Sequence, residues 1–125
     1  MVVDTSALMA ILLSEPDAER CIAVLEGQSE VMISAGTLAE ALIVAGRRNI
    51  AGEMNALVEG LGIEIVSVSG AGSTRVAEAY ARFGKGVHAA SLNFGDCFAY
   101  ALARELGRPL LFVGDDFSKT DIEAA

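Results

Sequence analysis

The sequence is poor in sulfur and imidazole side chains, with two cysteines and one histidine in 125 residues. Cys21 and Cys97 stand far apart, and neither belongs to a Cys-x-x-Cys pair or a Cys/His cluster, which argues against a zinc site. His88 has no evident nucleophile beside it, so the sequence offers no Ser/His/Asp set for acyl transfer. We expect both cysteines to be reduced and mostly buried, as in a cytoplasmic protein.

Long apolar runs, a leader-like start and phosphate-binding glycine motifs are also missing. The longest aliphatic runs, such as Leu8–Leu13, are far shorter than the roughly 20 residues that a membrane-spanning helix needs. The chain reaches an acid at Asp4 without a positively charged stretch, which is unlike a secretory signal. Neither GxxxxGKS/T nor GxGxxG occurs, so the two common nucleotide-phosphate loops are excluded. We expect a cytoplasmic protein without a membrane segment.

Positive charge is scarce as well. Nine Lys and Arg residues stand against seventeen Asp and Glu residues, which gives a formal net charge of −8. This balance argues against a protein that coats nucleic acid through a broad basic face, but it allows an enzyme with a small basic patch. No stretch interleaves basic and aromatic residues in the manner of an RNA-binding platform, and tryptophan is absent.

Apolar residues make up 53% of the chain, enough for the core of one domain spanning residues 1–125. Short runs rich in Val, Ile and Leu, apolar on both faces, are typical of buried parallel strands. Between them, apolar residues recur at helical spacing, with glycines as stops. This alternation predicts an α/β fold, a three-layer α/β/α sandwich around a parallel sheet. The expected strands are Met1–Val3, Val31–Ile33, Ile63–Val68 and Leu110–Val113, and the expected helices include Ala18–Leu25, Met54–Leu61, Val76–Phe83 and Phe94–Leu106.

Acidic residues follow the first and the last expected strands. Asp4 ends the first strand pattern and the pair Asp115 and Asp116 ends the last one. In parallel sheets, ligands bind beyond the carboxyl ends of the strands, so both positions point at a site. The ordinary alternatives are that Asp4 caps a helix beginning near Ser6 and that at least one of the paired acids lies in a solvated turn.

Two further acids stand alone in apolar helical segments. Glu40 is the only charged residue in Leu38–Val44, and Asp96 is the only acid in Leu92–Tyr100. Burying a carboxylate is costly unless it is paired or binds a cation. The ordinary alternatives are that Glu40 faces solvent and that Asp96 favours the first turn of a helix capped by Asn93.

The two strand-end positions and the two helical acids together predict a carboxylate cluster at one end of the sheet. Without compensation, such carboxylates would repel one another and raise one another's pKa values. Oxygen-only clusters bind Mg²⁺ or Mn²⁺, which lower the pKa of bound water and neutralise a phosphate under in-line attack. The residues alone therefore favour metal-dependent phosphodiester hydrolysis.

Four segments of the chain carry a more specific pattern. They are Val3–Leu8, Thr37–Glu40, Leu92–Ala103 and Pro109–Asp121. In this order, and over essentially the whole chain, they resemble PIN-domain ribonucleases, in particular the VapC toxins of VapBC toxin–antitoxin modules. The resemblance implies a PIN-like four- or five-stranded sheet, the fifth strand here being short or missing. It also implies a Mg²⁺-dependent endoribonuclease, with Mn²⁺ as an alternative ion, acting on tRNA, rRNA or mRNA. It implies a VapB-like antitoxin and a homodimer.

The resemblance also assigns residues by position. Asp4, Glu40 and Asp96 match the firmly placed family acids, and the fourth acid is Asp115 or Asp116, of which the family pattern favours Asp116. Supporting positions that hydrogen-bond the carboxylates in the family match Thr5, Ser6 and Asn93, and Asp121 is expected to add a contact from outside the cluster. The candidate cations for RNA phosphates are Arg47, Arg82, Lys85, His88 and Lys119.

Two other functions fit parts of the pattern. One is a PIN-like RNA- or metal-binding module that has lost catalysis, although all four acidic positions are filled here. The other is a phosphoacceptor α/β domain, which needs an acid pair near the first strand and a lysine after the last one. The chain has only Asp4 near the first strand, in place of an acid pair, and Lys119 is the only lysine after the last strand.

Overall fold

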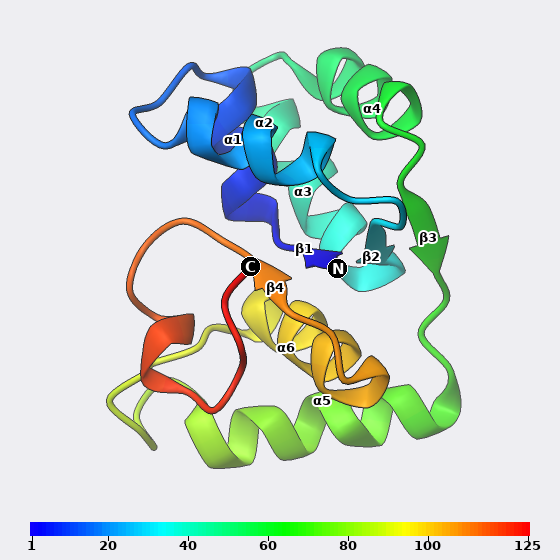
Figure 1. The fold of residues 1–125 in the computed structure, drawn as a ribbon. Helices are drawn as coiled ribbons and strands as arrows, with labels where there is room; N and C mark the ends of the chain where they lie inside the picture. The colour runs from blue at the N-terminus through cyan, green and yellow to red at the C-terminus, as the bar shows by residue number, and fades with distance from the viewer.

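A computed structural model describes all 125 residues and contains a four-stranded parallel sheet with helices on both faces (Figure 1). The strand order is β3-β2-β1-β4, so the N-terminal strand is central. The strands are β1 (Val2–Val3), β2 (Met32–Ser34), β3 (Glu64–Val66) and β4 (Leu110–Leu111). The helices are α1 (Thr5–Leu12), α2 (Ala18–Glu26), α3 (Ala35–Arg47), α4 (Ala51–Gly60), α5 (Gly70–Phe83) and α6 (Phe94–Leu106), followed by the 3₁₀ turn η1 (Phe117–Lys119). The predicted three-layer α/β architecture is confirmed.

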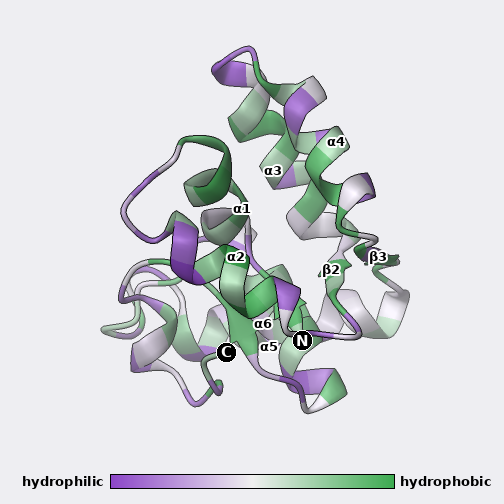
Figure 2. Cartoon of the chain, turned by 45° about the horizontal axis from the view of Figure 1, so that its top comes forward, coloured by the Kyte–Doolittle hydropathy of each residue, from purple (hydrophilic) through white to green (hydrophobic).

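The short strands divide the core into two layers. Val3, Ile33 and Leu111 pack into a cluster with residues of α1 to α4 on one face of the sheet. Val2 and Leu110 pack with residues of α5 and α6 on the other face. Successive strand residues point to opposite faces, so each two-residue strand contributes to both layers. Figure 2 shows hydrophilic segments mainly in the loops and on outward helix surfaces.

Local signals set the helix ends. The sequence predicts a helix over Phe94–Leu106, and α6 has these bounds. It begins with Asn93 in a capping box and ends at Gly107, whose φ of 61° is a left-handed conformation that glycine adopts at little cost. Gly27 likewise follows the last residue of α2. None of the helices is both long and apolar enough to cross a lipid bilayer.

The expected fifth strand is reduced to a single bridge. Ala124 pairs with Leu110 in the parallel sense, and the amide nitrogen of Leu110 donates to the carbonyl oxygen of Glu123 at 2.9 Å. The C-terminal segment therefore covers the edge of β4, while β3 remains an open edge. The prediction of a short or missing fifth strand is confirmed.

The two cysteines are free and buried, as predicted. Cys21 belongs to the core cluster on the α1–α4 side of the sheet, and Cys97 to the cluster on the α5–α6 side. The sheet therefore separates the two thiols.

Candidate functional site

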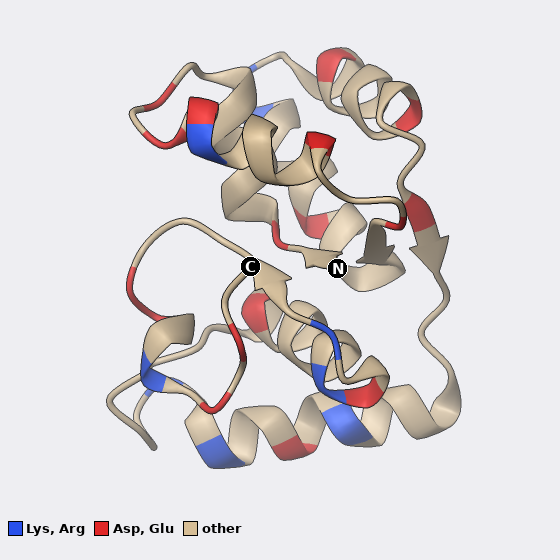
Figure 3. Ribbon diagram, viewed as in Figure 1, with Lys and Arg blue, Asp and Glu red and all other residues tan.

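The four acidic positions occupy the carboxyl end of the sheet. Asp4 directly follows β1, the pair Asp115 and Asp116 follows β4, and Glu40 lies on α3, the helix that starts where β2 ends. Asp96 lies in the first turn of α6. Figure 3 shows acidic positions at the end of β1 and at the start of α6 close to each other in the middle of the molecule.

Asp4 is the most buried acid of the site, with 2% of its surface exposed. Its Oδ2 accepts from the backbone nitrogen of Ser6 at 3.0 Å and from the Ser6 hydroxyl at 2.7 Å, which caps α1. Its Oδ1 is buried without any hydrogen-bond partner. The capping role anticipated from the sequence is real, but it occupies only one of the two oxygens.

One carboxylate oxygen of Glu40 is also fixed by a hydrogen bond. The hydroxyl of Thr5 donates to Oε1 of Glu40 at 2.8 Å. The carboxylate lies against Gly95, where an added Cβ would overlap Oε2. The ring of Phe98 similarly fills the place of a side chain at Gly36. Helices α3 and α6 thus approach each other through one glycine on each helix, and this approach brings Glu40 to the start of α6.

Asp96 is anchored by the capping box of α6. Its Oδ2 accepts from the backbone nitrogen of Asn93 at 3.0 Å, and the Asn93 side chain accepts from the backbone nitrogen of Asp96 at 2.8 Å. No donor of the protein contacts the other carboxylate oxygen of Asp96. The three acids therefore share one arrangement, in which one oxygen is fixed by the fold and the other is free.

Burial and mutual repulsion raise the pKa of two of these carboxyls. Burial raises the pKa of Asp4 to about 7, against the opposing hydrogen bonds from Ser6, and the charges of Asp96 and Glu40 add to the rise. Burial also raises the pKa of Asp96 to about 6, with Glu40 and Asp116 as neighbouring negative charges. A bound cation relieves both effects, because it replaces lost hydration and offsets the repulsion.

The donor set fits a hard divalent cation held partly through water. It consists of carboxylate oxygens alone, and Oδ1 of Asp4 is a buried oxygen left without a donor. No three acidic, histidine or cysteine side chains lie close enough together to enclose an ion by themselves. Mg²⁺ suits such an open set because it keeps several waters of its own.

The acids after β4 are the most exposed members of the site. Both lie in the loop between β4 and η1, just after Gly114, whose φ is 101°. The negative charge of Asp116 is one of those that raise the pKa of Asp96. This electrostatic effect favours Asp116 as the fourth acid.

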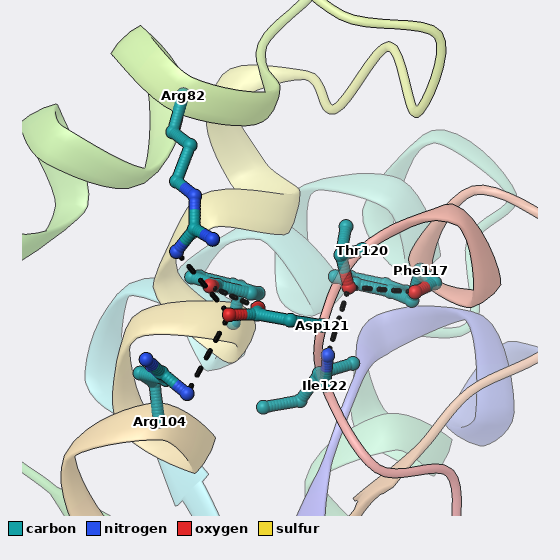
Figure 4. Close-up of polar contacts among 7 residues, drawn as sticks. Arg82, Arg104, Phe117, Thr120, Asp121 and Ile122 are labelled. Atoms are coloured by element: carbon teal, nitrogen blue, oxygen red, sulfur yellow. Dashed lines mark hydrogen bonds and ion pairs between the residues drawn. The ribbon is translucent and has the colours of Figure 1, made fainter.

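Asp121 does not support the acid cluster, which corrects the sequence-based expectation. Its carboxylate accepts from the Tyr100 hydroxyl at 2.5 Å and pairs with Arg82 at 3.2 Å and Arg104 at 3.5 Å (Figure 4). These contacts lower the pKa of Asp121, led by the Tyr100 hydrogen bond, while burial raises the pKa of Tyr100 to about 12. Asp121 faces α5 and α6 because Arg82, Arg104 and Tyr100 on these helices all bind its carboxylate. It fastens the C-terminal segment to these helices.

The candidate RNA-binding cations differ in their availability. Arg82 is paired with Asp121 and lies 4.7 Å from the centre of the Phe83 ring, so its charge is already shared. His88 Nδ1 accepts from the backbone nitrogen of Ala90, which leaves Nε2 as a donor. Of the candidates, Arg47, Lys85 and Lys119 are exposed and form no ion pair, and the same is true of Arg48 beside Arg47.

An apolar groove of about 370 Å³ adjoins Glu40. Its lining includes Ile43 and Phe94, which are 58% and 68% exposed, and Arg47. A second groove of about 380 Å³ on the α5 side is lined by Tyr80 and shares Phe94 and Phe98 with the first. Phe94 therefore projects between two apolar hollows beside the acid site.

Gly95 is a residue of the candidate site that the sequence alone does not single out. A signal was present, because a glycine inside an expected helix is disfavoured by about 1 kcal/mol relative to alanine and often has a packing reason. Only the structure shows that the reason is the carboxylate of Glu40.

Comparisons with known proteins give one consistent result. The family model described as "PIN domain" matches residues 1–123. Ribonuclease VapC30 of Mycobacterium tuberculosis is 43% identical over 125 residues, covering 98% of this chain and 95% of the relative.

Two solved structures agree in fold. M. tuberculosis VapC20, described as a sarcin-ricin loop cleaving toxin, has a TM-score of 0.81 at 19% identity and covers 99% of this chain and 97% of its own. VapBC2 from Rickettsia felis, solved bound to a DNA fragment from their promoter, has a TM-score of 0.72 at 15% identity and covers 99% and 96%.

Proposed function

This chain belongs to the PIN-domain family, in its VapC branch, and we propose that it is a divalent-metal-dependent endoribonuclease, the toxin of a toxin–antitoxin pair, that hydrolyses RNA phosphodiester bonds. We take residues 1–125 as one nuclease domain. The observation that carries the proposal is the orphaned Oδ1 of Asp4, a buried carboxylate oxygen in an all-oxygen donor set. The 43% identity to a ribonuclease supports a catalyst over a module that only binds RNA or metal. Membership of this family sets aside the phosphoacceptor alternative.

The acids Asp4, Glu40, Asp96 and Asp116 hold the metal, for which Mg²⁺ is the proposed ion and Mn²⁺ the alternative. When bound, the ion supplies positive charge that lowers the pKa of water and stabilises the phosphate under attack. Thr5, Ser6 and the backbone nitrogen of Asn93 keep the carboxylates oriented. Each of these three acids thereby keeps one carboxylate oxygen without a hydrogen-bond donor from the protein, and this oxygen is available to a cation or to its bound water.

The chain's cations receive the RNA backbone. Arg47, Lys85, Lys119 and the Nε2 of His88 are the available donors, while Arg82 has a lesser part because Asp121 neutralises it. Phosphate contacts of this kind fix the register of a strand without reading its bases. Substrates among tRNA, rRNA and mRNA, all present in the cytoplasm, are therefore selected by the shape of the RNA and of the protein surface around the acids.

The acid site and the apolar surface beside it each suggest a protein partner. A VapB-like antitoxin is proposed to cover the acid site, in keeping with the VapBC complex of similar fold. A second copy of the chain is proposed to bind the apolar surface formed by Ile43, Tyr80, Phe94 and Phe98. The Phe94 ring projects between two grooves, so this ring of one copy can enter a groove of the other and the reverse. A two-fold interface requires such a self-complementary surface.

The dimer is tested by sedimentation of the isolated chain. Ile43→Glu places a charge in the apolar surface, in the groove that adjoins Glu40, and should convert the dimer to monomer. Leu61→Glu, at a 38% exposed position at the end of α4, is the matched control and should remain dimeric. A monomeric wild-type chain would refute the proposed interface.

The activity is tested by incubating the purified chain with total RNA and structured tRNA in the presence of Mg²⁺, Mn²⁺ or EDTA. Asp96→Asn keeps an oxygen acceptor for the capping box but removes the charge, so it should remain folded and lose at least about 100-fold in cleavage. Glu53→Gln, an exposed acid in the first turn of α4, should cleave like the wild type. Cleavage that survives EDTA or Asp96→Asn would refute the metal site, and intact binding of RNA or metal without cleavage would support the binding module instead.

A further inference from the structure

One peptide group in the loop after β4 is held from both sides. The carbonyl oxygen of Phe112 accepts from Nη2 of Arg20 at 3.1 Å. The backbone nitrogen of Val113 donates to the Ser6 hydroxyl oxygen at 3.0 Å. These two atoms belong to the same trans peptide unit, so they point in opposite directions and each partner contacts a different edge.

The contact with Val113 determines where the Ser6 hydroxyl points. A serine hydroxyl has a single proton, and in Ser6 that proton goes to Oδ2 of Asp4 at 2.7 Å while the oxygen accepts from Val113. An uninterrupted hydrogen-bonded path therefore runs from the Arg20 guanidinium through the peptide and Ser6 to Asp4. Hydrogen bonds in series polarise one another, and this series starts at a full positive charge.

The same peptide leads into the loop that carries the fourth acid. Gly114 and the acids Asp115 and Asp116 follow it, and the loop is fastened again at Phe117, which is 3% exposed and packs on the Phe112 ring at 5.2 Å. The polar anchors at the first end of this loop are Arg20 and Ser6.

Arg20 also pairs with Asp17, the residue before α2. Its Nε donates to Asp17 at 3.0 Å, and both side chains are nearly half exposed. An exposed pair of this kind adds little to stability, so the ion pair alone does not account for the position of the guanidinium. Its bond to a carbonyl 92 residues away in the sequence links the surface of α2 to the acid site.

We propose that Arg20 is a positioning residue of the acid site, which fixes the Phe112–Val113 peptide and thereby orients Ser6, Asp4 and the loop bearing Asp116. This inference rests on the proposed function for its effect on catalysis. The clamp on the peptide is a property of the metal-free chain and can be measured independently of any activity.

The first measurement is amide hydrogen exchange of Val113 in the metal-free protein. Arg20→Ala should accelerate this exchange at least about threefold, because the peptide loses one of its two anchors. Asp17→Asn is the matched control, since it removes the ion pair but leaves Arg20 able to donate to Phe112. Equal exchange in the wild type and in Arg20→Ala would refute the clamp, even if the chain proves to be no nuclease.

The second measurement is Mn²⁺ binding by calorimetry, alongside RNA cleavage kinetics. Arg20→Ala should raise the Mn²⁺ dissociation constant about threefold or more while leaving KM for RNA unchanged, and Asp17→Asn should change neither. In the double variant Ser6→Ala/Arg20→Ala the Arg20 effect should largely disappear, because the path is already broken. A raised KM with unchanged Mn²⁺ affinity would instead make Arg20 an RNA contact and overturn the proposal. If the wild type itself neither binds Mn²⁺ nor cleaves RNA, the proposed function fails and the exchange result still decides the clamp.

Discussion

At the scale of single residues, the acids of the candidate site use one carboxylate oxygen for the fold and leave the other for the proposed metal binding. Asp4 and Asp96 each give one carboxylate oxygen to the start of a helix, and Glu40 gives one to Thr5. The hydrogen bond to one oxygen fixes the orientation of the carboxylate. Binding a cation through the second oxygen therefore costs little further side-chain conformational entropy. Each acid can therefore hold the fold together through one oxygen and still have the proposed metal-binding role.

The buried Asp4 gives a prediction about pH. Its pKa of about 7 in the folded chain lies above the ordinary value of roughly 3.9, so the folded state binds the proton more tightly than the unfolded state does. The metal-free wild type should therefore lose stability as the pH rises from about 4 to about 7, relative to Asp4→Asn, by at most about 4 kcal/mol. Urea unfolding of both proteins at several pH values measures the difference, in which the buried amide of the variant adds a constant offset. A difference independent of pH would contradict the assigned burial of the charge.

Gly95 gives a second prediction at this scale. In Gly95→Ala the new methyl group meets the Glu40 carboxylate and displaces it, so the Mn²⁺ dissociation constant should rise at least about tenfold. Gly46→Ala, on the same helix as Glu40 but with open space around it, should bind Mn²⁺ normally and be neutral or stabilised by up to about 1 kcal/mol. Calorimetry and thermal unfolding of the two variants separate the packing effect from the general effect of removing a glycine.

At the scale of secondary-structure elements, helix capping and the proposed metal binding depend on different groups at the start of α6. Asn93→Ala removes the acceptor for the Asp96 backbone nitrogen and should lower the free energy of unfolding by about 1 kcal/mol. It keeps the backbone donor of residue 93 on the Asp96 carboxylate, so metal affinity should fall far less than in Asp96→Asn. Unfolding and metal titration of the two variants should thus give opposite rankings. If Asn93→Ala abolished metal binding, the capping side chain would be essential to the site itself.

The elements also show which parts of this molecule are predictable from its sequence. The bounds of α6 follow from local signals, an Asn cap and a terminal Gly, and these signals act within a few residues. The candidate acids follow from two features of the sequence, since Glu40 and Asp96 are lone carboxylates in apolar segments and the other acids stand at strand ends. The position of Asp121 does not follow, because Tyr100, Arg82 and Arg104 come from two helices whose spatial arrangement is not encoded locally. The same holds for Gly95 and Arg20, whose partners are distant in the sequence.

At the scale of the whole molecule, a divalent metal ion should stabilise the folded chain. An ion that binds only the folded state stabilises it by about 2.7 kcal/mol at a concentration 100 times its dissociation constant. Mn²⁺ should therefore raise the melting temperature of the wild type, more at pH 8 than at pH 5.5, because Asp4 and Asp96 must lose protons to bind it. Asp96→Asn should show a much smaller shift at either pH. An equal shift in both proteins would indicate binding elsewhere on this chain of net charge −8.

The central place of β1 has a consequence for folding while the chain is being made. The strand bearing Asp4 lies between β2 and β4, and its partner in β4 is not synthesised until residues 110–111. A nascent chain that has not reached this point lacks both a neighbour of β1 and the acid at position 116. Since a domain folds as a unit, the sheet and the candidate acid cluster at its carboxyl end are completed only after residues 110–116 have been synthesised.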